Sequence, residues 1–432
     1  MIYSTKGRQL VLSMIGVALW IGFACSDKEN SGTSGKNYDP SRPVKVTEFY
    51  PDSGGMATKM IIKGENFGVN PTDVGVYFNE KKAAVVESNG DMLYVIVPKQ
   101  PGDDCKISVV VGNDSLTLEK TFSYITSVTV STVAGKVGVS ASTDGTLAEA
   151  EFHTPRYLVI DAERNIFVSD WRNHRLRQIN EASNLVTTVH SGNGMEYPNG
   201  PATDADKKVI FVPNDGGNVF LEFDPEKQWA GKKITPRPAE GEEFSIDYKH
   251  SLAPNQLDKL IYTRAHNGQL IKFDARTKAA WLVDLDLMPG SDSFLYFHPT
   301  KQNLLYISYS KKNCIYTYDL ETKEHILYAG AVNEAGYMDG EREYSQFNNP
   351  RQICFDKDEN LYIADEGNHV IRKIDRNGIV STVVGIPGVK GYRDGNPDEA
   401  MFDTPTGVAI DDEGIIYIAD YENRLIRKLA IE

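Results

Sequence analysis

The chain has 432 residues, enough for two or three domains. Hydrophobic residues make up 41% and charged residues 25% of it, and these shares exclude a disordered or collagen-like chain. The 36 Gly and 22 Tyr favour a β-rich fold with many turns. A formal net charge of −14, without a basic patch to offset it, predicts no nucleic-acid partner, because an acidic surface repels a phosphate backbone.

The one long apolar run lies at the N-terminus. Two basic residues precede an uncharged stretch at 10–24, and Cys25 follows directly. A stretch of about fifteen residues is typical of a secretory signal peptide and too short for a spanning helix. The pair Ala24-Cys25 resembles a bacterial lipobox, which implies that residues 1–24 are cleaved and that Cys25 is the lipid attachment site. An ordinary signal peptide with an incidental Cys is the alternative.

Residues 25–43 are rich in Ser, Gly and Asn and cannot bury a core, so they are predicted to form a flexible tether. The acidic segment directly after Cys25 resembles the surface-export signal of Bacteroidetes lipoproteins. That resemblance implies a protein on the outer membrane, lipid-anchored and facing the cell exterior, with no other membrane contact. The periplasmic face is the alternative location.

Three further cysteines remain: Cys105, Cys314 and Cys354. Their odd number and their spacing give neither a disulfide framework nor a zinc signature. We expect them to be small buried hydrophobic residues, and we predict no metal site and no cofactor.

Residues 44–126 form the first predicted domain. Its short alternating apolar segments are typical of sandwich strands and lie at 59–62, 74–78, 94–97 and 107–111. Three motifs resemble the IPT/TIG immunoglobulin-like domain: Pro51-Asp52-Ser53-Gly54-Gly55, Gly64-Glu65-Asn66-Phe67-Gly68 and Val97-Pro98. The resemblance implies a β-sandwich with Phe67 at one end, used as a spacer or docking module.

An internal repeat extends from residue 127 to residue 432. Three copies keep an Asp-Gly pair eleven residues before a Pro and a strand-ending Asp fifteen residues after that Pro. These landmarks are Asp144, Pro155 and Asp170; Asp339, Pro350 and Asp365; and Asp394, Pro405 and Asp420. Weaker copies lie around 210–214, 260–264 and 305–309.

This repeat resembles the NHL repeat, and three strong plus three degenerate copies imply a six-bladed β-propeller over 127–432. The predicted fold class is therefore all-β: an immunoglobulin-like β-sandwich followed by the propeller. The chain ends at 425–429, the third strand of the last blade. Residues 130–134 are expected to supply the missing fourth strand, because ring closure removes exposed sheet edges.

Unusual side chains gather on the face formed by the loops after each second strand. The strand-ending aspartates are expected to cap neighbouring turns. Arg264 and Tyr309 replace this aspartate without structural gain, which is where function is expected. Four aromatic residues, Arg264 and Tyr309 are predicted to line a ligand site. The aromatic residues are Trp171 and Tyr421, directly after a strand-ending Asp, and Tyr337 and Tyr392, two residues before an Asp-Gly. For Arg264 and Tyr309 the alternative is drift in a degenerate blade, and for Tyr337 and Tyr392 it is packing between neighbouring loops.

Aromatic platforms with hydrogen-bonding edges suit sugar recognition. A lipoprotein with IPT/TIG and NHL modules resembles accessory proteins of Bacteroidetes glycan-utilisation systems. The implied function is binding of a glycan or other small ligand beside a TonB-dependent transporter. A protein-interaction scaffold of a surface complex is the alternative.

An enzyme is not favoured, and no catalytic residue is predicted. Neither a nucleophile elbow nor a spaced His pair occurs. If the chain were an enzyme, its resemblance to propeller lyases and lactone hydrolases would imply a metal-dependent reaction. His250 and His298 align with the turn position of Asp161, on the face opposite the predicted ligand site.

Overall fold

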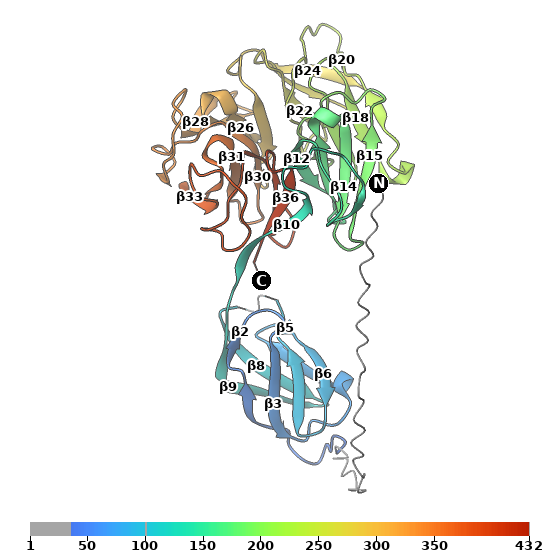
Figure 1. Ribbon diagram of the computed structural model, residues 1–432, viewed down its shortest axis with the longest axis vertical. Helices are drawn as coiled ribbons and strands as arrows, with labels where there is room; N and C mark the ends of the chain where they lie inside the picture. The colour runs from blue at the N-terminus through green and yellow to red at the C-terminus, as the bar shows by residue number, and fades with distance from the viewer. Residues whose placement is uncertain (1–35, 100–101, 432) are drawn as a thin grey trace, which may run out of the picture. The chain divides into compact units, whose positions relative to one another are not determined.

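The computed structural model in Figure 1 describes residues 36–99 and 102–431. Regular structure there is β-strand, apart from single-turn 3-10 helices, and the chain divides into two units after Tyr124. Within these described residues, no helix combines the length and apolar character needed to span a membrane. The predicted signal peptide and Cys25 lie outside the described residues.

The first unit is a sandwich of two sheets around one core, as the sequence predicted. Phe67 is fully buried in that core, and the strands alternate buried and exposed side chains. One sheet has the order β1 (Lys45–Tyr50), β3 (Lys59–Glu65), β7 (Met92–Ile96), β6 (Ala84–Ser88). The other has the order β2 (Ser53–Gly54), β9 (Asp114–Tyr124), β8 (Asp104–Val111), β4 (Val74–Phe78), β5 (Lys81–Lys82).

The end of the predicted tether is fixed to this unit, which differs from the expectation. The Asn66 amide donates to the carbonyls of Asp39 and Arg42 at 2.9 and 2.7 Å, and its Oδ1 accepts the Asp39 N–H at 2.9 Å. Tyr38 packs against the core. Composition missed this anchoring because one asparagine and one tyrosine secure a segment that is otherwise polar.

The second unit consists of six sheets, numbered blades 1 to 6 in chain order of their innermost strands, and this confirms the predicted propeller (Figure 1). The innermost strands form a closed ring in which each contacts the next and β34 contacts β12. They are β12 (Pro155–Ile160), β16 (Ala202–Thr203), β21 (Ala253–Pro254), β25 (Ser293–Phe297), β30 (Pro350–Phe355) and β34 (Pro405–Ile410).

The remaining strands follow outward by antiparallel pairing. The second strands are β13 (Ile166–Asp170), β17 (Ile210–Pro213), β22 (Ile261–Arg264), β26 (Leu304–Tyr309), β31 (Leu361–Asp365) and β35 (Ile416–Asp420). The third strands are β14 (Arg175–Asn180), β18 (Phe220–Phe223), β23 (Leu270–Phe273), β27 (Cys314–Asp319), β32 (Val370–Ile374) and β36 (Leu425–Ile431).

The fourth strands are β15 (Leu185–Ser191), β19 (Lys232–Ile234), β24 (Ala279–Asp284), β28 (His325–Gly330), β33 (Ile379–Val384) and β10 (Val128–Gly135). Two-residue strands edge blades 1, 3 and 5: β11 (Gly145–Thr146), β20 (Arg237–Pro238) and β29 (Gly340–Glu341).

Ring closure occurs in blade 6 as predicted. Strand β10 pairs antiparallel with β36, from Val128 opposite Ile431 to Gly135 opposite Leu425. Val130 and Val133 of β10 are buried in the packing on either side of this blade. The first strand after the sandwich and the last strand of the chain therefore share one sheet.

A buried arginine explains the repeated aspartates. Arg372 is fully buried, and its guanidinium donates to Asp365 Oδ2 at 2.9 Å and to Asp339 Oδ1 at 2.6 Å. The Asp365 carboxylate also accepts a hydrogen bond from the Asn348 N–H at 2.8 Å. This is the backbone contact that the sequence predicted for the strand-ending aspartates. Arg177 in blade 1 and Arg427 in blade 6 lie between equivalent aspartates. The strict spacing of the repeat thus preserves a buried ion cluster.

Candidate functional site

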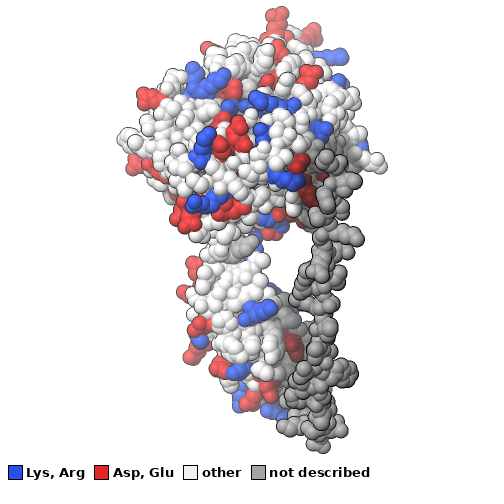
Figure 2. Space-filling view, in the orientation of Figure 1, with Lys and Arg blue, Asp and Glu red and all other residues white. Residues whose placement is uncertain are grey.

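The loops after the second strands and the starts of the innermost strands share one face of the propeller, here called the loop face. These parts lie close together because the first residue of an innermost strand pairs with the last residue of the second strand. Pro155 pairs with Asp170 in this way, and Pro350 pairs with Asp365. Acidic and basic side chains are interspersed over the visible surface of this unit (Figure 2).

A cleft of about 640 Å³ opens on the loop face between blades 1 and 2. Its lining residues are His153, Trp171, Arg172, Tyr197 and Asp215. The Trp171 and Tyr197 rings lie 5.1 Å apart at 51°, and Tyr197 is 43% exposed. The cleft thus offers two aromatic rings beside a carboxylate and a guanidinium.

Two of these lining side chains carry unpaired buried nitrogens. Trp171 Nε1 and His153 Nδ1 are buried without a hydrogen-bond partner. The Arg156 guanidinium lies 4.5 Å from the centre of the Trp171 ring. Both nitrogens are shielded from solvent, so they are exceptions to the rule that buried polar atoms have partners.

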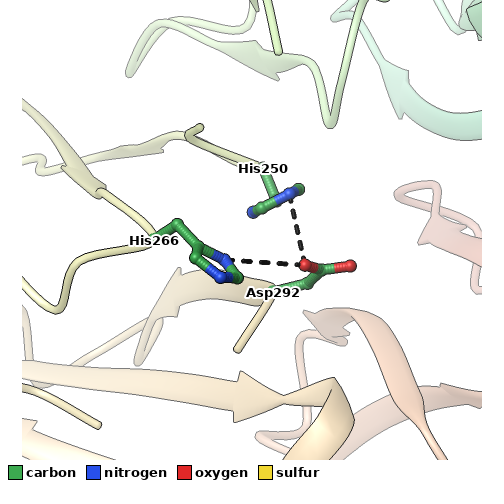
Figure 3. Close-up of side chains that lie close together, drawn as sticks. All are labelled: His250, His266 and Asp292. Atoms are coloured by element: carbon green, nitrogen blue, oxygen red, sulfur yellow. Dashed lines mark ion pairs between the residues drawn. The ribbon is translucent and has the colours of Figure 1, made fainter. Parts of the chain in front are cut away.

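A second polar group lies beside the cleft at the mouth of the central channel. Figure 3 shows the His250 and His266 rings turned toward the same oxygen of Asp292. His250 Nε2 lies 3.4 Å and His266 Nδ1 3.9 Å from Asp292 Oδ1. His250 Nε2 is also 3.7 Å from Asp215 Oδ1, which joins this group to the cleft.

The surrounding charges set the ionisation of this group. Burial lowers the pKa of His250 to about 4, although Asp292 and Asp215 oppose the shift. Burial would raise the pKa of Asp292, but the positive groups at His250 and Arg351 hold that pKa below its usual value. Arg351 donates to Asp292 Oδ2 at 2.7 Å and also pairs with Glu366.

The central channel is closed below this group. The Tyr157 ring of blade 1 meets the Phe294 ring of blade 4 at 4.9 Å between centroids. Gln352 of blade 5 crosses to blade 1, where its amide pairs with the backbone of Leu158. A separate cavity of about 320 Å³, largely apolar, lies on the other side of these contacts.

Of the six predicted ligand residues, Trp171 is the one that lines the cleft. Tyr421 is half-buried on the loop of blade 6 that corresponds to the Trp171 loop of blade 1. Glu366 occupies the same repeat position in blade 5 and reaches Arg351. The aromatic position after the strand-ending Asp therefore belongs to the loop face, as the sequence predicted.

Arg264 and Tyr309 are structural, which corrects the expectation that they contact ligand. Both side chains are fully buried. The Arg264 guanidinium donates to the carbonyls of Leu287, Met288 and Ser291, and it lies over the Tyr309 ring at 5.0 Å. The Tyr309 hydroxyl lies 3.1 Å from His325 Nε2. In blade 3, Arg264 takes the position of the strand-ending Asp. Its guanidinium is paired by backbone carbonyls instead of by the aspartates of the strong repeats.

Tyr337 and Tyr392 make structural contacts, but they stay 40% and 44% exposed, so ligand contact at these residues stays a prediction. Each lies over the buried arginine of its blade, at 4.7 Å for Tyr337 over Arg372 and 4.9 Å for Tyr392 over Arg427. The Tyr337 hydroxyl contacts Asp339 and Thr382, and the Tyr392 hydroxyl contacts Asp394 and Thr132. These contacts attach both rings to the outermost strands of their blades.

The structure also corrects the alignment of one histidine. His298 does take the turn position of Asp161, since its Nδ1 accepts the N–H of Lys301. His250 instead lies on the loop face, and Asn255 takes the turn position in its blade. The degenerate blade lacks the Asp-Gly landmark, so the sequence offered no fixed register there.

Two family models match the chain. The IPT/TIG domain matches residues 43–124, and the NHL repeat matches residues 402–429. The chain therefore carries an IPT/TIG domain followed by an NHL-repeat propeller. Among curated relatives, the chloroplastic protein SUPPRESSOR OF QUENCHING 1 of Arabidopsis thaliana is 27% identical over 312 residues, 68% of this chain. This chain spans 26% of that protein's length.

Solved structures from Bacteroides share the whole architecture. A structural genomics protein from Bacteroides thetaiotaomicron is 27% identical with a TM-score of 0.69, over 92% of this chain and 100% of its own. An auxiliary nutrient binding protein from the same species is 25% identical with a TM-score of 0.63, over 92% and 99%. A Bacteroides ovatus protein described in the same words is 22% identical with a TM-score of 0.69, over 92% and 100%, and shows the fold.

Proposed function

We propose that this chain is a surface-anchored accessory protein that binds a nutrient, and that the nutrient is a short glycan held in the loop-face cleft. The observation that carries this proposal is the half-open aromatic pair, Trp171 and Tyr197, beside Asp215 and Arg172. The Bacteroides thetaiotaomicron relative described as an auxiliary nutrient binding protein supports the general role.

The chemistry of the cleft favours a sugar over an apolar molecule. Aromatic faces pack against the C–H faces of a pyranose ring, while a carboxylate and a guanidinium bind vicinal hydroxyls. A volume of about 640 Å³ falls within the range of small-molecule sites.

Replacing Trp171 with Ala is expected to weaken glycan binding by about 1–3 kcal/mol, because the ring supplies the stacking surface of the cleft. A glycan array with the purified chain identifies the ligand, and calorimetry then measures its affinity for wild type and variant. Tyr344→Ala is the matched control, since Tyr344 is an aromatic residue 71% exposed outside the cleft. Equal affinities for all three proteins would place the site elsewhere.

Anchoring belongs to the same proposal. The Ala24-Cys25 pair supports acylation of Cys25 and membrane anchoring. The proposed place beside a TonB-dependent transporter at the outer membrane rests on the resemblance to accessory proteins of glycan-utilisation systems. A Cys25→Ala variant is expected to lose palmitate labelling and to leave the membrane fraction. Unchanged labelling and fractionation of this variant would disprove the lipid anchor without bearing on the cleft.

A further inference from the structure

We propose that His250, His266 and Asp292 form a binding site for one divalent first-row transition metal ion, such as Zn²⁺, at the channel mouth on the loop face. The three residues come from blades 3 and 4: His250 precedes β21, His266 follows β22, and Asp292 precedes β25. Figure 3 shows the two rings and the carboxylate converging on one point.

The spacing of the donor atoms matches the distance between metal ligands. One ligand atom from each residue lies within 4.8 Å of the other two. The separations of 3.4 and 3.9 Å from Asp292 Oδ1 are too long for hydrogen bonds. Ligands at about 2.0–2.1 Å from a tetrahedral zinc ion lie roughly 3.3 Å apart. Small side-chain movements would therefore bring all three atoms into coordination distance.

The carboxylate is already oriented for this role. Arg351 donates to Asp292 Oδ2, the oxygen that faces away from the two rings. Glu366 pairs with the same guanidinium and balances its charge. Supporting contacts of this kind hold a metal-ligating carboxylate in place in known sites, while Oδ1 stays available to the ion.

The environment of His250 gives an independent reason for a cation. Its ring is about nine-tenths buried, and Nδ1 has no hydrogen-bond partner. Nε2 faces carboxylate oxygens of Asp292 and Asp215 at 3.4 and 3.7 Å. When this nitrogen carries its lone pair, it is repelled by both oxygens. A metal ion between them reverses the sign of each contact, and the ring proton then resides on Nδ1.

The donor set selects the class of ion. Two imidazole nitrogens and one carboxylate oxygen suit Zn²⁺ and its first-row neighbours, whereas Mg²⁺ and Ca²⁺ prefer oxygen ligands. Asp215 Oδ1 lies 3.7 Å from His250 Nε2 and accepts a hydrogen bond from the Asn199 amide at 2.9 Å. Because Asp215 also lines the cleft, the three ligands border the cleft through it.

The test is titration of the chelator-stripped full chain, without an affinity tag, with Co²⁺ and with Zn²⁺. Visible absorption of bound Co²⁺ reports its ligands, and competition with a chromophoric chelator gives the Zn²⁺ affinity. We expect one ion per chain. His266→Gln should weaken binding by about tenfold or more, and His250→Gln should abolish it. His369→Gln, on the same face outside this group, is the matched control and should bind as wild type does.

Absence of stoichiometric binding to wild type would overturn the proposal, and so would wild-type affinity in both His250→Gln and His266→Gln. His266 is 36% exposed, so its substitution tests the site even if the His250 variant fails to fold. The measurement needs no glycan. Trp171→Ala should retain metal binding, so failure of the glycan proposal and failure of the metal proposal remain distinguishable.

Discussion

Replacing Val128–Gly135 with a Gly/Ser segment of equal length is expected to destabilise the propeller by about 5 kcal/mol or more. Strand β10 supplies the outer edge of blade 6, where it pairs with β36 along its whole length. The replacement removes the buried side chains of Val130 and Val133 and exposes β36 as an unpaired edge. Differential scanning calorimetry should show the propeller transition lost or shifted far down, with aggregation on heating.

The sandwich in the same chain serves as the internal control. It is a separate compact unit with its own core, so its melting transition should not move. A propeller transition that stays within a few degrees of wild type would show that β10 does not hold the ring together.

Arg372→Met is expected to lower the free energy of unfolding by about 3–5 kcal/mol, the usual cost of removing one partner from a buried ion pair. Methionine keeps the apolar stem of the side chain but cannot donate to Asp365 and Asp339. It also removes the guanidinium hydrogen bonds to the carbonyls of Met338 and Gln346. Urea unfolding followed by circular dichroism measures the loss.

Arg376→Met is the matched control, because Arg376 is exposed two residues beyond the end of β32. That variant should unfold within about 0.5 kcal/mol of wild type, as surface substitutions usually do. Equal midpoints for the two variants would contradict a stabilising role for the buried cluster.

The fold could be predicted because its determinants are repeated. The spacing of Asp-Gly, Pro and strand-ending Asp recurs with one buried arginine in three blades, so each copy supported the others. The last repeat copy supplies only three strands, which predicted that residues 130–134 would complete its blade. The pairing of β10 with β36 confirms this prediction. The sequence therefore states the same structural pattern three times.

The site was less predictable because part of it lies in the blades that depart from the repeat. Arg264 suggested function by breaking the pattern, yet its guanidinium meets backbone carbonyls that no motif reveals. His250 was placed on the wrong face, because its blade lacks the landmarks that fix register. Tyr197 was missed since it precedes the short inner strand β16 of a degenerate copy. Trp171, in a strong repeat, was found.

The pairing of β10 with β36 in blade 6 also constrains the order of folding. Its partner residues, such as Val128 and Ile431, are about 300 positions apart, so β10 emerges early in synthesis and its partner emerges last. The ring cannot close until the final strand is complete, and pairing over such separations is slow. The sandwich has no such delay, because all its strands lie before Ile125. In an exported chain the sandwich would therefore fold first, and β10 would stay unpaired until β36 is complete.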